Sequence, residues 1–420
     1  CQTIVAQAAN VPSPTLDRQA GLRAKIMARI LVWQSKFSKA EAVTPLLQES
    51  QRFLEKAQQA GEEVHSERAL ILLRLGLAVT GDSRLCEQSL LLYQQLGNRW
   101  GEAQALDAMG WLAWSSGNYA EAEQLYRKGL TIYQDLGDQK GIAVSSLFLG
   151  IAMLFQGRSE GEMMLREGLA IYEEVGDHAA MAAGWYYAGI GLMSLGHFVE
   201  AHTFLERSVH TYQDLGIVEH TANIFLGGAK VHLGQYEQGR SLAQIGLDLA
   251  RARDDQAAIG YALIVLGWVA LIRENYAEAL RLFQESTERC RSIEQKDMIS
   301  WGLTFMGYTY CRLNQLTQAS QRLHQALEIA EEIQSFVAYK FILSGVALFM
   351  IKLREERRAI EFYALASRYP MIANSRWFAD TVGQYIAALT NTLPPNIVAR
   401  AKEEGRAHDL DKTITALLVE

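Results

Sequence analysis

The sequence predicts an all-α protein in which helix pairs stack into a right-handed superhelix, an α-solenoid of about eight to nine pairs with C-terminal capping helices. Three observations predict it. A pattern of about forty residues recurs along most of the 420-residue chain. Within each unit the apolar residues are spaced by three and four, which is the helical period. The chain has only 6 prolines, and its 49% hydrophobic and 21% charged residues exclude wholesale disorder.

One glycine in each unit sets the register of the repeat. A glycine inside a helix costs about 1 kcal/mol relative to alanine, so its recurrence indicates close packing against the second helix of the pair. Small residues recur at one place in that second helix, as close packing requires. The register glycines are Gly76, Gly110, Gly150, Gly189, Gly227, Gly267 and Gly307, followed by Ala347. The small residues are Ala122, Ala201, Gly239, Ala279, Ala319 and Ala359.

Two breaks divide each unit into helices. The first follows each register glycine and contains a turn, as in Gly117-Asn118-Tyr119 and Glu274-Asn275-Tyr276. The second is a glycine that ends the second helix, because glycine accepts the left-handed conformation without a Cβ clash. These glycines are Gly97, Gly137, Gly176 and Gly216. Each unit is therefore predicted to read helix, tight turn, helix, cap.

The pattern divides the chain into three regions. Residues 1–60 should form N-terminal helices and a degenerate repeat, with Phe37 and Ala40 in the aromatic and small positions. Residues 61–369 should form the regular array, and residues 370–420 the capping helices. Asn374 to Thr390 is predicted as one helix, and Pro394-Pro395 is predicted to open a short terminal one.

These spacings resemble the tetratricopeptide repeat. Gly110, Gly117, Tyr119, Ala122, Tyr126 and Gly129 match the family's order of small and aromatic positions. The resemblance covers about Leu16 to Tyr369. The repeats are longer than usual and look like the variant found in kinesin light chains and in many bacterial signalling ATPases.

The C-terminus carries a second resemblance. Leu393-Pro394-Pro395, Glu404-Gly405-Arg406-Ala407 and Leu410-Asp411 look like the closing segment of bacterial STAND and LuxR-type regulators. This resemblance implies a sensor or autoinhibitory arm of a larger signal-transduction ATPase or transcriptional regulator, with the ATPase N-terminal to Cys1. A free-standing scaffold for protein–protein interaction and a peptide-pheromone receptor are alternatives. A lipid-anchored protein is a further one, which rests on Cys1 alone.

The sequence offers no chemistry of its own. It contains no Walker motif, no nucleophile elbow and no H-E-x-x-H pair, so we expect no catalytic residues, no metal site, no cofactor and no nucleotide hydrolysis. The net charge of −7 gives no electrostatic case for nucleic acid or an anionic membrane. The apolar stretch Gly260–Ile272 is shorter than the ~20 residues that span a bilayer. Four widely spaced cysteines fit a reducing cytoplasm.

The family resemblance implies a binding wall on the inner side of the superhelix, built by the first helix of each pair. On this chain that row is nearly all apolar, with aromatics at its centre. It suits a protein or peptide partner, the chain's own missing N-terminal ATPase or effector region among them, or a small inducer. The predicted binding residues are Asp107, Trp111, Trp114, Leu147, Ile151, Tyr186, Ile190, Trp268 and Tyr308.

The five aromatic residues of this row are the predicted anchors. The competing interpretation makes the same side chains ordinary packing between neighbouring helices. Solvent exposure separates the two, because an anchor must be accessible to its partner.

Overall fold

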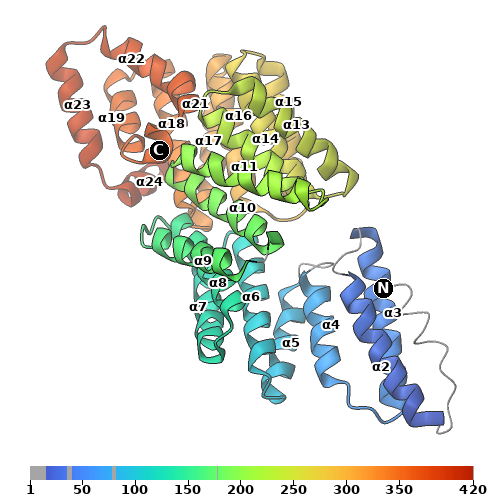
Figure 1. Cartoon of the computed structure of the whole chain (residues 1–420). Helices are drawn as coiled ribbons and strands as arrows, with labels where there is room; N and C mark the ends of the chain where they lie inside the picture. Colours follow the sequence, from blue (N-terminus) through green and yellow to red (C-terminus); the bar gives the residue numbers. More distant parts are fainter. Residues whose placement is uncertain (1–15, 36–39, 78–81, 177, 420) are drawn as a thin grey trace. The chain divides into compact units, whose positions relative to one another are not determined.

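The computed structural model describes residues 16–35, 40–77, 82–176 and 178–419, and these confirm the all-α fold class (Figure 1). In this part of the chain, α2 to α19 make nine consecutive helix pairs, and no strand occurs. The helices form two compact units. Unit 1 comprises Cys1–Trp114 with Glu121–Ser145, and unit 2 comprises Ser115–Ala120 with Ser146–Glu420. The predicted Phe37 position lies outside the described residues.

The first six helices lie in unit 1, except for the last residue of α6 and the first two residues of α7. They are α2 (Leu16–Ser35), α3 (Ala40–Gln59), α4 (His65–Leu75), α5 (Ser83–Gln95), α6 (Arg99–Ser115) and α7 (Tyr119–Leu136). The boundary between the units then passes through α8 (Gln139–Phe155). α5 has 13 residues against 17 in α6.

Unit 2 continues the array to α19. Its helices are α9 (Gly161–Val175), α10 (His178–Leu195), α11 (Phe198–Asp214), α12 (Thr221–His232), α13 (Tyr236–Ala252), α14 (Gln256–Ile272), α15 (Tyr276–Arg291), α16 (Lys296–Arg312), α17 (Leu316–Glu332), α18 (Phe336–Leu353) and α19 (Glu356–Ala366). The elements that follow are α20 (Pro370–Ala373), α21 (Arg376–Phe378), the π-helix η2 (Ala379–Gly383), α22 (Gln384–Thr390), α23 (Pro395–Ala407) and α24 (Leu410–Val419).

The register glycines lie where the two helices of a pair approach most closely. A Cβ atom on Gly110 would lie 3.0 Å from the ring of Tyr126, and one on Gly189 would lie 2.5 Å from Leu205 Cγ. In the pair α12 and α13 the backbones themselves meet, because a Cβ on Gly227 would lie 2.8 Å from the carbonyl oxygen of Gly239. Close packing is thus the reason for the recurring glycine.

Left-handed residues end the helices at intervals of about twenty residues. In the first part of the array they are glycines, such as Gly97 (φ 62°) and Gly117 (φ 83°). From α13 onward the same place is held by residues other than glycine: Asp254, Glu274, Glu294, Asn314, Gln334 and Arg354, with φ between 50° and 62°. A left-handed residue with a Cβ costs about 1–2 kcal/mol, so helix packing on both sides of each turn must hold it there.

The prediction of one continuous helix from Asn374 to Thr390 is wrong, because the segment is divided into shorter elements. Asn374 ends α20, and the backbone then runs through α21, the π-helix and α22. The predicted terminal helix is confirmed as α23, which packs against α19, while α24 packs against α17. Among the described residues one helix, α18, is long and apolar enough to cross a membrane by length and composition, and 72% of it is buried inside the protein.

Replacing Gly189 with leucine tests the register. The added side chain would overlap Leu205 on α11, so we expect the free energy of unfolding to fall by roughly 1–3 kcal/mol or more. Denaturant titration measures this change. Gly216→Asn is the control, because Gly216 is left-handed, a Cβ added there would have no neighbour within 4 Å, and asparagine tolerates that conformation. An unchanged midpoint for Gly189→Leu would show that this helix contact does not limit packing.

Candidate functional site

The structure places the nine predicted binding residues in two different environments. Leu147, Ile151, Ile190, Trp268 and Tyr308 are buried. Asp107, Trp111, Trp114 and Tyr186 are partly buried. The first group packs in the interior of the array as the structure stands, and only the second presents surface to solvent.

Trp268 and Tyr308 do not lie on an open wall, contrary to their prediction as exposed anchors. Trp268 is 2% exposed and Tyr308 is 0% exposed. The phenol of Tyr308 donates a hydrogen bond of 2.6 Å to the carbonyl oxygen of Phe341. Both rings also contact Trp377, with centroid distances of 5.6 Å for Trp268 and 6.1 Å for Tyr308. Neighbouring helices cover them in part, since Trp268 packs against Phe305 and Tyr308 packs against Gly345, and a segment from beyond the repeats adds further cover.

We call this segment, residues 370–390 (α20 to α22), the C-terminal insert, and we call α12, α14, α16 and α18 the inner wall of unit 2. The insert reaches all four of these helices. Trp377, which is wholly buried, donates a 3.1 Å hydrogen bond from its indole nitrogen to the carbonyl oxygen of Trp268 on α14. The Trp377 ring meets Phe305 on α16 at 5.5 Å, and Phe378 stacks on Phe341 of α18 at 5.6 Å.

His232, at the end of α12, makes a second polar contact between the insert and the inner wall. Its Nδ1 lies 2.8 Å from Ser375 Oγ, and its ring stacks on Phe198 at 4.3 Å and on Phe378 at 6.2 Å. Burial lowers the pKa of His232 to about 3, so the imidazole is neutral at physiological pH. A neutral imidazole can form this hydrogen bond with the serine hydroxyl without placing a charge in the interior of the protein.

Two glycine turns admit the insert at its start. A Cβ on Gly196 would collide with the backbone of Pro370 and Met371, and one on Gly234 would lie 2.8 Å from Arg376. Both turns also need positive φ, at 78° and 81°. The side chain of Asn374 donates a 3.1 Å hydrogen bond to the carbonyl oxygen of Gly196. The turns after α10 and α12 thus accommodate the insert as well as ending helices.

Hydrogen bonds that do not involve the insert also join distant repeats within unit 2. The phenol of Tyr119 donates a 3.2 Å hydrogen bond to Asp297 at the start of α16, and Lys340 on α18 donates a 3.2 Å hydrogen bond to the carbonyl oxygen of Ser194. Burial raises the pKa of Asp297 to about 6 and lowers that of Lys340 to about 7. These contacts join residues at least 146 positions apart, so early and late repeats of this unit touch directly.

The partly buried predicted residues form smaller clusters. Trp111 and Trp114 lie one helical turn apart on α6, with ring centroids 5.2 Å apart. Tyr186 on α10 lies 4.7 Å from Tyr187 and 5.6 Å from Phe225. These residues keep some exposure, so their role in binding stays a prediction.

Asp107 is a structural carboxyl group of unit 1. Its Oδ1 accepts a 2.8 Å hydrogen bond from Ser145, and a Cβ on Gly129 would lie 2.7 Å from the same oxygen. Burial raises its pKa to about 7, against the opposing effect of hydrogen bonds from Ser145 and Tyr133. The side chain therefore joins two helices of unit 1, and its role in binding a partner stays a prediction.

Metal-binding groups and reactive thiols are the two kinds of chemical site to consider among the described residues. These residues contain no group of three or more His, Cys, Asp or Glu side chains placed to hold a metal ion. The described cysteines Cys86, Cys290 and Cys311 are free and buried, and burial raises the pKa of each thiol, which suppresses the nucleophilic thiolate.

The insert was the part of this site that sequence reasoning missed. The signal available was the adjacent pair Trp377-Phe378, two large aromatics placed after the last repeat and close behind the capping serine Ser375. A capping helix on the end of an array should show one apolar stripe. Two consecutive apolar rings point to different sides of a helix and indicate burial all round.

Comparison with known proteins identifies the repeat and the fold. Residues 83–135 and 219–292 match the family model of the tetratricopeptide repeat. The structure of a Rap protein complexed with competence and sporulation factor is similar over 88% of this chain and 99% of that chain, with a TM-score of 0.61 and 14% identity. No match is found among curated protein sequences.

Two further structures share the fold at a lower level. NprR in complex with its cognate peptide NprX covers 75% of this chain and 90% of that one, with a TM-score of 0.51 and 15% identity. The Rap conjugation gene regulator of plasmid pLS20 in complex with the Phr* peptide covers 92% and 99%, with a TM-score of 0.51 and 15% identity. Identities this low show a common fold alone.

The raised pKa of Asp107 predicts a pH-dependent cost. Because the folded protein binds this proton more tightly than the unfolded chain, stability falls as pH rises from about 4 through about 7. Asp107→Asn should remove this dependence while still accepting the Ser145 hydrogen bond. We expect a gain of about 2 kcal/mol at pH 8, discounted from the full shift because the residue keeps some exposure.

Urea titrations of both proteins between pH 4 and pH 8 measure the effect. The exposed Asp214, replaced with asparagine, controls for the loss of one negative charge. A stability difference between Asp107→Asn and the unchanged protein that stays constant across this range would contradict the assignment.

Proposed function

We propose that this chain, which carries tetratricopeptide repeats, is a receptor that binds a peptide or a peptide-like protein segment on the inner wall of unit 2. One observation carries the proposal. The wall already holds an irregular segment, the C-terminal insert, through a buried tryptophan and hydrogen bonds to main-chain and side-chain groups. A surface that accommodates one such segment has the chemistry to accommodate another.

The insert contacts the array as a ligand does. In a repeat array each unit contacts mainly its neighbours, so stacking alone does not bring α20 to α22 against α10, α12, α14 and α18. The insert consists of short helical pieces joined by a π-helix, and Trp377 fills the centre of the contact. One buried aromatic anchor surrounded by smaller contacts is typical of a binding hot spot.

The proposal also explains why the inner wall is so apolar. If the insert leaves, Trp268, Phe305 and Tyr308 lose their contacts with Trp377, and Phe341 loses its contact with Phe378. Exposed apolar patches mark binding sites. On this proposal the receptor occupies its own binding wall, and a partner would bind by displacing the insert. The apparent affinity for that partner is reduced by the small fraction of molecules in which the wall is open.

The similar structures support a peptide as the partner, since they are complexes of Rap and NprR proteins with peptides or factors. A self-occupied wall also agrees with the predicted role as a sensor or autoinhibitory arm of a larger signal-transduction ATPase or regulator. A free-standing scaffold has less need of an internal occupant, so we rank it second. The cytoplasmic location is part of the proposal, supported by three free cysteines.

Replacing Trp377 with alanine should open the inner wall. Truncating a buried tryptophan typically costs about 3–5 kcal/mol, and this cost falls on the docking of the insert. A fluorescein-labelled peptide with the sequence of residues 370–390, added in trans, should therefore bind Trp377→Ala at least about ten-fold more tightly than the unchanged protein. Fluorescence anisotropy measures the affinity.

Trp100→Ala is the matched control, because Trp100 is 49% exposed and lies in unit 1. If Trp377→Ala does not fold, Ser375→Ala weakens the insert more mildly by removing the contact with His232. Equal affinity for the unchanged protein and for a folded opened variant, or no binding to that variant, would overturn the proposal. Either result would show that the insert is a permanent part of the core.

A further inference from the structure

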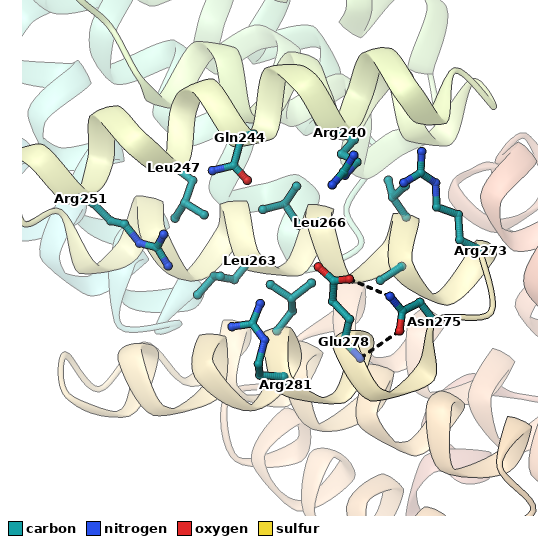
Figure 2. A pocket seen from close by; sticks show the side chains of 13 residues that line it. Arg240, Gln244, Leu247, Arg251, Leu263, Leu266, Arg273, Asn275, Glu278 and Arg281 are labelled. Carbon is teal, nitrogen blue, oxygen red and sulfur yellow. Dashed lines mark hydrogen bonds between the residues drawn. The ribbon is translucent and has the colours of Figure 1, made fainter.

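A pocket lies between α13 and α15, with α14 as its floor, and Figure 2 shows its side chains. The cavity measures about 130 Å³. Pockets for whole small-molecule ligands are typically about 300–1,000 Å³, so this one has room for the end of a single side chain or a group of that size. Its residues belong to unit 2, and none of them belongs to the C-terminal insert.

The floor of the pocket is apolar. Leu247 comes from α13, Leu263 and Leu266 from α14, and Leu282 from α15. All four are buried, so they are packed in the array and leave only a limited apolar surface at the bottom of the pocket. This floor favours a short aliphatic group over water.

The rim of the pocket is basic. Arg240 and Arg251 project from α13, Arg273 caps α14, and Arg281 projects from α15. Figure 2 shows Arg251 at one end and Arg273 at the other, with Arg240 and Arg281 between them from the two flanking helices. The lining holds four arginines and one acid, Glu278, which gives a formal charge of +3.

Acidic residues outside the lining neutralise part of this charge. Glu285 is shared by Arg251 at 3.2 Å and Arg281 at 3.3 Å, and Glu237 pairs with Arg273. Arg240 has no acidic partner among the described residues. Two carboxylates thus serve three guanidinium groups, and a fourth is left for a ligand.

The guanidinium groups retain unused donors. Each arginine side chain carries five N–H groups in a planar fork, and the hydrogen bonds to Glu285 and Glu237 use one N–H group from each of Arg251, Arg281 and Arg273. A carboxylate entering the pocket can accept bonds from the remaining donors while the existing ion pairs persist. Such charge-assisted bonds are shorter and stronger than bonds between neutral groups.

The repeat pattern does not account for these arginines. The next unit begins forty residues later, and its equivalents of Arg240, Arg273 and Arg281 are Leu280, Leu313 and Gln321. Only Arg251 has an arginine in the equivalent place, Arg291. The basic rim is therefore local to α13, α14 and α15, and three of its four arginines are absent from the next unit.

We propose that this pocket binds an acidic segment of a partner protein, with a carboxylate held by Arg240 and its neighbours and an adjacent aliphatic side chain on the leucine floor. The commitment to a carboxylate-bearing peptide rests on charge complementarity with the rim together with the apolar floor. The site is separate from the inner wall, so it stands whether or not the C-terminal insert can be displaced.

The test uses the full chain and a short fluorescein-labelled peptide of glutamate and leucine. Charge reversals Arg240→Glu and Arg281→Glu should each weaken binding at least about ten-fold at low salt, since each removes a charge-assisted contact and adds repulsion. Arg289→Glu is the matched control. It lies on α15 outside the pocket and, like Arg281, is four residues from Glu285, so both changes create the same new neighbour for that carboxylate.

Four outcomes would overturn the proposal. The peptide does not bind the unchanged protein, or both pocket variants bind it as tightly as Arg289→Glu does. A lysine–leucine peptide binds equally well, which would show that the floor alone attracts peptides. Inorganic phosphate at equal concentration displaces the peptide, which would assign the pocket to a free anion. Weakening in both pocket variants, with binding retained in the control, supports it.

Discussion

The close approach of paired helices at the register glycine is the constraint on which the rest of the structure depends. Between α12 and α13 the contact is reciprocal, because a Cβ on Gly227 would meet the carbonyl oxygen of Gly239 and a Cβ on Gly239 would meet that of Gly227. No rotamer change relieves a collision between backbones, so the separation of the pair is fixed. Pairs of nearly constant geometry then stack at a constant period, and α14 is buried on every side from Ala258 to Leu271.

Local features of this array could be read from the sequence, and features set by distant contacts could not. The register glycines and the turns at Gly117 and Gly157 follow from residue type and spacing. The left-handed residues Glu274 and Gln334 carry no such signature, because neighbouring helices impose their conformation. The tight turns were still predictable there from their place in the repeat, although the backbone conformation was not.

The candidate site divides in the same way. Sequence spacing placed Trp268 and Tyr308 correctly on successive first helices, and their ring contacts with Trp377 show that they face a common region. Packing between neighbouring helices was the competing interpretation of these residues, but their cover by Trp377 was not predictable, because no periodic pattern describes the path of a segment from beyond the repeats. The arginine pocket escaped notice for a related reason. Its four cationic residues are separated along the sequence, and only the packing of α13, α14 and α15 brings them together.

The polar groups at the contact of the insert argue for reversible docking. His232 with Ser375 and Asn374 with the carbonyl oxygen of Gly196 place hydrogen bonds where apolar residues could have packed. Such bonds add little net stability, but they are costly to leave unmade, so they fix one register for the insert. They also lower the cost of leaving, since water or a partner can satisfy the same groups. A purely apolar core would lack both properties. A receptor that occupies its own binding wall requires both properties. Its insert must have a single register, and it must be able to leave without leaving polar groups unpaired.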